Sequence, residues 1–460
     1  MSVVKNREEL LEEGGDEREE RGLLLDLVDV AIRAADPREA VKREVKFDGK
    51  AVSVAGEIFP LDKVGNVYVV GAGKASGAMA EALELVLGDL IVDGVVCVQK
   101  GTSKMFSVKK VRLFETSHPI PTEENVRGAE EVVKLVEGAG EGDIVICLIS
   151  GGGSAMLTFP AEGLELRDVQ EVTTLLLKSG ADIGKINIVR RHLSRVKGGL
   201  LAKIAYPAFV VSLIVSDVVG DRLEDIASGP TAPDPTTLSD AVNVLKMYGL
   251  WEKCGERVKR RLLSGVEGRV EETLKPGDPV FEKVRNVLVA TNRKACTAVA
   301  CEAARRGLNS FILTTHMEGE AREVGCLAGG IVRSVALNGE PLRRSALIVM
   351  GGETTVTIHG DAGRGGRNQE LALSAALKIA GLRKVFVVSF GTDGVDGASH
   401  AAGALVNGRT VKRGVMRGAM AEEYLRRHDT TSFFEEIGDG LIVTGPTGTN
   451  VNDIVMLAAL

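Results

Sequence analysis

The chain has 460 residues, of which 44% are hydrophobic and 26% charged, a composition typical of globular proteins and unlike that of disordered, collagenous or disulfide-rich ones. Its net charge of −6 and the lack of a basic block argue against nucleic acid as the main partner. The 55 glycines indicate many tight turns and close backbone approaches. The N-terminal residues are charged and no apolar run is long enough for a membrane helix, so we expect a cytoplasmic protein.

Apolar runs rich in β-branched residues, each followed by a glycine- or aspartate-containing loop, alternate with helical patterns along the chain. This alternation predicts an α/β fold with mainly parallel sheets. Residues 1–45 have the pattern of an amphipathic helix with Leu23, Leu24, Leu27, Val28 and Ile32 on its apolar face. Strands are expected at residues 67–70, 144–149, 210–215, 287–290, 346–350, 385–389 and 441–443.

The composition changes between residues 230 and 280, where several prolines and a charged helical stretch replace the alternating apolar runs. This change predicts the connection between two α/β domains. We expect an N-terminal domain at 1–265 and a C-terminal domain at 266–460, whose last segment could pack back on the first. Ligands of open α/β sheets bind at the carboxyl ends of the strands. The active site is therefore expected in the cleft between the domains.

The motif GAGKASG at residues 71–77 follows a predicted strand and opens a helix, where backbone N–H groups favour an anion. It partly matches a dinucleotide-binding fingerprint, with Asp93 in the place of the ribose-binding acid. The spacing GxGxxxG and the lysine in the turn, Lys74, argue against that interpretation and suit phosphoryl transfer. A glycine turn that serves only helix–strand packing is the remaining alternative.

A second glycine loop follows the predicted strand at 144–149, and its backbone N–H groups would form a cradle for phosphate or carboxylate. We expect this cradle to consist of Ser150, Gly151, Gly152, Gly153 and Ser154. The basic segment at 187–199, which contains Arg191, is either an anion pocket or a solvated helix face.

Carboxylates follow two further strands, Asp217 in SDVVGD and Asp393 in GTDGVDG. Such residues hold magnesium or accept a proton, although a capping or turn role competes. The strongest signal is GGETT followed by GRGGRNQE, because its glycines let the backbone approach a ligand and arginine suits phosphate and carboxylate. The candidate binding residues in this segment are Glu353, Arg364, Arg367 and Asn368.

These motifs together indicate phosphoryl transfer on a small acidic molecule. Seven of them occur in order over most of the chain and resemble the glycerate 2-kinase family, the last three its MOFRL-type C-terminal domain. They are GAGKASG, SGGGSA, INIVRRHLSRVKGG, SDVVGD with ASGPT and DPTT, GGETTVT with GRGGRNQEL, GTDGVDG and GPTGTNVND. His400 departs from the acidic residue that family members often carry there.

The resemblance implies ATP- and Mg²⁺-dependent phosphorylation of D-glycerate to 2-phosphoglycerate by two α/β domains, the first Rossmann-like. It implies Lys74 and Arg367 as catalytic cations, and Asp217 and Asp393 as the catalytic carboxylates, either of which could be base or metal ligand. Ser150–Ser154 and Arg191 are assigned to substrate or phosphate binding, and a homodimer is possible. The alternatives are an NAD(P)H-dependent hydroxypyruvate reductase and a non-catalytic metabolite-binding protein.

Overall fold

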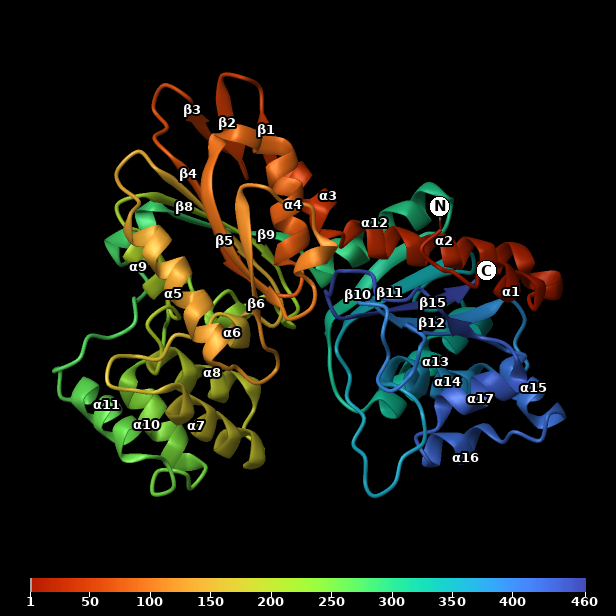
Figure 1. Ribbon diagram of the computed structural model, residues 1–460. Coiled ribbons are helices and arrows are strands. Elements are labelled where there is room, and N and C mark those ends of the chain that lie inside the picture. Colours follow the sequence, from red (N-terminus) through yellow and green to blue (C-terminus); the bar gives the residue numbers. More distant parts are fainter. Residues whose placement is uncertain (1) are drawn as a thin grey trace. The chain divides into compact units, whose positions relative to one another are not determined.

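The computed structural model describes residues 2–460 and divides into two compact units (Figure 1). Unit 2 is the continuous segment Pro37–Val289, and unit 1 combines the segment that ends at Asp36 with Ala290–Leu460. The division therefore differs from the expected boundary at residue 265. Residues 266–289 contribute the last strand of the unit 2 sheet, and the N-terminal helices pack within unit 1.

Unit 2 is built on a six-stranded sheet in the order β6-β5-β4-β7-β8-β9, and the pairings from β6 to β8 are parallel, as predicted. Helix α4 packs on one face and also contacts α3, while α5 and α9 pack on the other face. The elements are α3 (Pro37–Glu44), β4 (Val67–Ala72), α4 (Ser76–Leu87), β5 (Ile91–Gln99), β6 (Val111–Thr116), α5 (Glu123–Glu137), β7 (Ile144–Ile149), α6 (Gly153–Met156), α9 (Leu200–Ala205), β8 (Phe209–Val215) and β9 (Val284–Ala290).

Two smaller elements complete unit 2. One is an antiparallel sheet of β1 (Val45–Phe47), β2 (Ala51–Val54) and β3 (Glu57–Pro60). The other is a helical cluster with its own apolar core, which includes part of the segment expected to connect the domains. Its helices are α7 (Leu166–Lys178), α8 (Ile183–His192), α10 (Leu238–Met247) and α11 (Glu256–Val266).

Unit 1 contains a mixed six-stranded sheet in the order β10-β11-β15-β12-β13-β14. Only β10 and β11 pair in parallel, so the expectation of a mainly parallel sheet is wrong for this unit. The C-terminal strand enters between β11 and β12 and runs antiparallel to both, and β13 runs antiparallel to its neighbours β12 and β14. The last segment thus belongs to this sheet rather than to the first domain, on which it was expected to be able to pack. The strands are β10 (Asn309–Met317), β11 (Ala346–Gly352), β12 (Val385–Gly391), β13 (Gly403–Asn407), β14 (Leu441–Ile442) and β15 (Asp453–Ala459).

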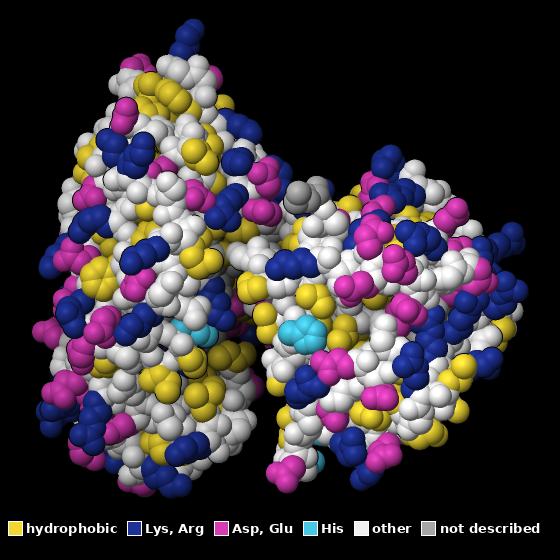
Figure 2. All heavy atoms as spheres, turned by 45° about the vertical axis from the view of Figure 1, so that its right-hand side comes forward, with side chains coloured by type: hydrophobic (Ala, Val, Ile, Leu, Met, Phe, Trp, Pro, Cys, Tyr) yellow, Lys and Arg dark blue, Asp and Glu magenta, His cyan; other side chains and the backbone are white. Residues whose placement is uncertain are grey.

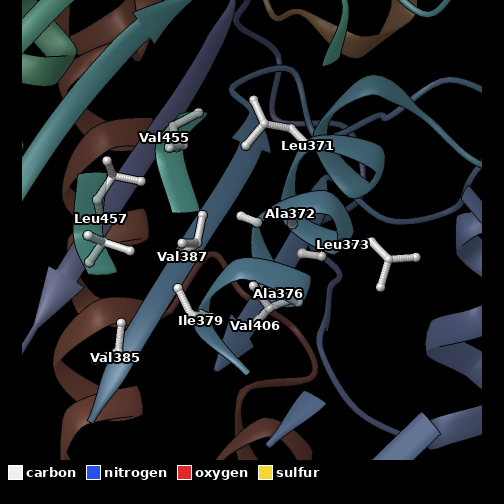
Figure 3. Close-up of a cluster of buried hydrophobic side chains, with 14 of the residues drawn as sticks. Leu371, Ala372, Leu373, Ala376, Ile379, Val385, Val387, Val406, Val455 and Leu457 are labelled. Atoms are coloured by element: carbon white, nitrogen blue, oxygen red, sulfur yellow. The ribbon is translucent and has the colours of Figure 1, made fainter. Parts of the chain in front are cut away.

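Helices cover both faces of this sheet. On one face α12 packs against β10, β11 and β15 and also contacts α2. On the other, α13 and α14 pack together, and α14 buries Leu371, Ala372 and Ile379 in a core shared with β12 and β13 (Figure 3). The helices are α1 (Arg7–Glu12), α2 (Arg18–Ala34), α12 (Asn292–Arg305), α13 (Ala321–Asn338), α14 (Arg367–Ile379), α15 (Thr410–Met416), α16 (Ala421–Arg426) and α17 (Thr430–Ile437).

Within unit 1, a buried ion pair joins the N-terminal segment to the C-terminal one. Arg21 of α2 donates two hydrogen bonds of 2.7 Å to Asp439, and both side chains are almost fully buried. Arg413 pairs with the same carboxylate. Of the predicted apolar face, Leu24, Leu27, Val28 and Ile32 are buried and Leu23 is half-buried. The single helix expected over residues 1–45 is instead divided into α1, α2 and α3.

Acidic and basic side chains are interspersed over the face that Figure 2 displays. Within residues 2–460, none of the helices combines the length and apolar character needed to cross a membrane.

Candidate active site

In unit 2, the loops after β4 and β7 are joined to each other by hydrogen bonds. The Lys74 amide donates to the carbonyl of Gly151 at 2.9 Å, and the Ala75 amide donates to Oγ of Ser150 at 3.0 Å. Ser150 is buried and its hydroxyl also contacts that of Ser76. Ser150 therefore holds the two predicted loops together at the carboxyl end of the sheet.

Asp217, which follows β8, lies directly against the glycine loop. A Cβ atom on Gly151 would come within 2.1 Å of Asp217 Oδ2, so only glycine permits this approach. Burial raises the pKa of Asp217, and the positive charge of Lys74 partly opposes that effect. A carboxylate with a raised pKa beside a cation can serve as a general base.

The cradle contains donors that no protein group uses. Lys74 is exposed, and within residues 2–460 its ammonium forms no ion pair or hydrogen bond. The amides of Gly151 and Gly152 likewise donate to no described residue, and Gly152 has a φ of +82°, in the left-handed region. These groups are available to bind an oxyanion.

His118 also borders the cradle, although the sequence analysis did not single it out. A Cβ atom on Gly152 would lie 3.1 Å from Cδ2 of the imidazole, so the ring packs against this glycine. Burial and, to a lesser degree, the charge of Lys74 lower the pKa of His118. The imidazole is therefore favoured in its neutral form beside the cradle.

Arg191 lies in a different environment from the one expected. Its guanidinium is buried and pairs with Asp225 at 3.3 Å and Asp234 at 3.1 Å, and Nη1 also donates to the carbonyl of Glu224. These protein acceptors surround the charge. The contacts of Arg191 thus favour a structural role over the predicted anion binding.

In unit 1, Arg367 is held at the N-terminus of α14 by two carboxylates. Nε and Nη2 donate to Asp453 at 2.6 and 3.0 Å, and Nη1 donates to Glu353 at 2.7 Å. Asp453 reaches this position because it begins β15 and is the register partner of both Gly352 and Gly391. The side chain of Arg367 remains 31% exposed, so its other N–H donors can reach a ligand.

Asp396 fixes the start of the same helix. Its oxygens accept hydrogen bonds from the amides of Asn368 and Gln369 at 3.0 and 2.9 Å. A Cβ atom on Gly366 would lie 2.2 Å from Asp396 Cγ, so the glycines of this motif permit close packing of the two loops. The side-chain amide of Asn368 donates to both Asp396 and Asp453.

The titration of this cluster follows from its burial. Burial raises the pKa of both Asp453 and Asp396 to about 6, and hydrogen bonds from Arg367 and Asn368 oppose that effect at Asp453. For Arg367, burial alone would lower the pKa, but the bond to Asp453 reverses this and raises it. Above pH 6 the Asp453 carboxylate therefore carries its negative charge beside the guanidinium of Arg367.

The remaining predicted residues of unit 1 have separate roles. Arg364 pairs with Glu435 through both terminal nitrogens, which favours a surface ion pair over ligand binding. Asp393 uses Oδ1 to accept the Val395 amide at 3.1 Å and is half-buried.

A magnesium site built only from protein ligands is not evident in this structure. Within residues 2–460 no three His, Cys, Asp or Glu side chains form a metal-binding group. Mg²⁺ in nucleotide enzymes is usually held by one or two carboxylates together with phosphates and water. Asp393 in unit 1, which leaves Oδ2 uncommitted, and Asp217 in unit 2 could each supply one such carboxylate.

The position of Asp93 argues against dinucleotide binding. Asp93 is the register partner of Tyr68 near the start of the sheet strands, whereas the glycine loop follows Ala72, whose partner is Cys97. Four residues of strand separate these levels, or about 13 Å. Asp93 instead pairs with Arg112, so it lies at the wrong end of β5 to bind a ribose beside the loop.

Comparisons with known proteins agree with the two-part organisation. Residues 23–263 match a family described as a domain of unknown function, DUF4147, and residues 346–453 match the MOFRL family. The chain is 47% identical over 436 residues to glycerate 2-kinase of Pyrococcus horikoshii, which covers 95% of this chain and 96% of the relative. It is 40% identical over 434 residues to D-glycerate 2-kinase of Thermotoga maritima, with 94% and 97% covered.

A solved structure of glycerate kinase from Thermotoga maritima superposes with a TM-score of 0.85 at 39% identity, covering 95% of this chain and 99% of that one. A relative from Agrobacterium vitis, 41% identical over 94% of this chain and 93% of its own length, has a provisional hydroxypyruvate reductase name.

Proposed function

The chain belongs to the glycerate 2-kinase family, and on this premise we propose that it transfers the γ-phosphoryl group of ATP to the 2-hydroxyl of D-glycerate. The products are 2-phosphoglycerate and ADP. The observation that carries the proposal is the cradle of unit 2, in which the uncommitted ammonium of Lys74 and two free amides lie beside Asp217.

Each of these groups has a task in phosphoryl transfer. Lys74 and the amides of Gly151 and Gly152 offset the negative charge on the oxygens of the transferred group. Asp217 accepts the proton of the attacking hydroxyl, a role that suits its raised pKa. Arg367, oriented by Asp453 and Glu353, supplies the second catalytic cation.

Mg²⁺ belongs to the proposal as the partner of the nucleotide phosphates. Asp393 would hold the ion through its uncommitted oxygen, and Asp217 is the alternative ligand. When bound, the ion supplies positive charge to the phosphate oxygens.

The direct test is an assay of the purified protein with ATP, Mg²⁺ and D-glycerate. We expect ADP formation, and ³¹P NMR of the product should show a phosphate ester on C2 rather than C3. A parallel assay follows NADH oxidation with hydroxypyruvate. Oxidation of NADH without ADP formation would refute the kinase and support the reductase name carried by the Agrobacterium relative.

A further inference from the structure

Two cations of unit 2, Arg190 and Lys197, have no carboxylate partner, unlike the adjacent Arg191. Arg190 on α8 is half-buried, and it forms no hydrogen bond or ion pair with any residue from 2 to 460. The next residue, Arg191, is surrounded by Asp225 and Asp234. Burial without a partner lowers the pKa of Arg190. One arginine of this adjacent pair is therefore neutralised by the protein, and the other is not.

Lys197 is the second cation. Its side chain is 4% exposed, and its ammonium donates a 2.6 Å hydrogen bond to the carbonyl of Leu157. Burial, and then the nearby charge of Arg190, lower the pKa of Lys197 to about 7. A buried ammonium beside another cation is electrostatically unfavourable, and a bound anion would relieve this repulsion.

The two cations lie next to the glycine cradle. Leu157 directly follows α6, which begins within the cradle. Asn187, three residues before Arg190, accepts a hydrogen bond from Ser228, and Ser228 contacts the hydroxyl of Ser154 at 2.9 Å. Because residues three apart are neighbours on a helix surface, Arg190 shares the side of α8 that borders this loop.

We propose that Arg190 and Lys197 bind the carboxylate of the acid substrate. The planar guanidinium is suited to the two carboxylate oxygens, and the ammonium adds a point charge. This leaves Lys74 and the amides of Gly151 and Gly152 for the phosphoryl group. The two uncompensated charges by themselves indicate that this site binds a compact oxyanion. Only the identification of that anion as D-glycerate rests on the proposed function.

The test combines steady-state kinetics with direct binding, using R190Q and K197M. We expect the KM for D-glycerate to rise about tenfold or more, while kcat and the KM for ATP change less than about twofold. Calorimetry without nucleotide should show a matching loss of D-glycerate affinity, and R190K should restore part of it. A purely structural role would not separate the two KM values in this way.

R195Q is the matched control. Arg195 belongs to the same basic segment, but it is exposed and stacks on Phe159 with Cζ 4.5 Å from the ring centroid. Its removal should leave both KM values unchanged. If K197M fails to fold, as judged by circular dichroism, R190Q alone decides the question.

Two kinetic results would overturn the assignment. A rise of the KM for ATP alone in R190Q would mean that the bound anion is a nucleotide phosphate. Unchanged KM values would mean that Arg190 binds neither substrate. A wild-type protein without glycerate turnover would refute the proposed function instead. In that case a thermal-shift titration with inorganic phosphate tests the anion site itself, since equal stabilisation of wild type and R190Q would contradict it.

Discussion

Asp453 binds Arg367 through two hydrogen bonds, to Nε at 2.6 Å and to Nη2 at 3.0 Å. Because both carboxylate oxygens engage the guanidinium, this fork gives the arginine one defined orientation. Asp453 is itself positioned by strand pairing on both sides, with Gly352 and Gly391. A cation assigned to catalysis is thus oriented by a residue 86 positions away in the sequence.

We expect D453N to reduce kcat by about tenfold or more, because one oxygen of the fork is replaced by an NH₂ group that repels the guanidinium. The reduction should appear in steady-state kinetics without loss of the folded state in circular dichroism. D361N is the matched control, since Asp361 is an exposed aspartate of the same unit. Wild-type kinetics in D453N would show that Arg367 does not depend on this carboxylate.

The activity should fall as the pH drops below about 6. The pKa of Asp453 is raised to about 6, so its carboxylate is protonated below that pH and loses its charge toward Arg367. A pH–rate profile between pH 5 and 8 measures this acidic limb, and a flat profile would contradict it.

The same group affects stability with a defined sign. An unfolded aspartate ionises near pH 3.9, whereas native Asp453 keeps its proton to about 6. Its stabilising contribution is therefore complete below the unfolded pKa and is lost as the pH rises through 6. The free energy of unfolding, measured by denaturation between about pH 4 and 6, should decrease more with rising pH in the wild type than in D453N.

Gly151 gives a test of the cradle in unit 2. We expect G151A to lower activity by about a hundredfold, because the added Cβ would meet Asp217 Oδ2 at 2.1 Å and displace the carboxylate or the loop. G330A is the control, since a Cβ at Gly330 has no atom within 4 Å. Full activity of G151A would mean that Asp217 and the loop need not approach each other for turnover.

Loss of either cation that we propose to be catalytic should reduce turnover strongly and leave the fold intact. K74A and R367A each remove a contact to the developing charge, for which a decrease of about a hundredfold or more is expected. Stopped-time ADP assays measure the rate, and melting curves report the fold. Near-normal rates in both variants would refute these roles and favour a binding protein that uses the same residues.

The buried pair of Arg21 and Asp439 should matter for stability. D439N leaves the buried guanidinium without its full counter-charge, which typically costs about 3–5 kcal/mol. Denaturant titration measures the free energy of unfolding. R18M provides the comparison, because Arg18 pairs with Glu8 on the exposed surface at 3.4 Å and such pairs contribute about 0–1 kcal/mol. Equal effects of the two variants would contradict the role of burial.

Most of the strands that the sequence predicts are buried on both faces, although β9 is largely half-buried. The runs that became β7 and β12 are buried along their whole length, so their apolar pattern is continuous. In contrast, β10 is largely exposed or half-buried and gave no such signal. The direction of β15 depends on pairings with residues about one hundred positions away in β11, and no local pattern carries that information.

The site shows the same division between local and distant signals. The loops around Lys74, Gly151 and Asp217 follow strands, so their position at the sheet edge could be predicted. His118 and Asp453 were missed because their partners, Gly152 and Arg367, are distant in sequence. For a pair of adjacent arginines on a helix, the rotation of about 100° per residue decides which one faces the acids, and composition cannot distinguish them.

Unit 1 is built from two segments that are separate in the sequence, and this determines which unit can fold first during synthesis. When the ribosome has added residue 289, unit 2 is fully synthesised, but unit 1 has only its first segment, up to Asp36. Since domains generally fold as units from the N-terminus, unit 2 can form first. The apolar face of α2 must then wait for α12, and Arg21 for Asp439. A helix made near the start of synthesis is thus among the last to be buried.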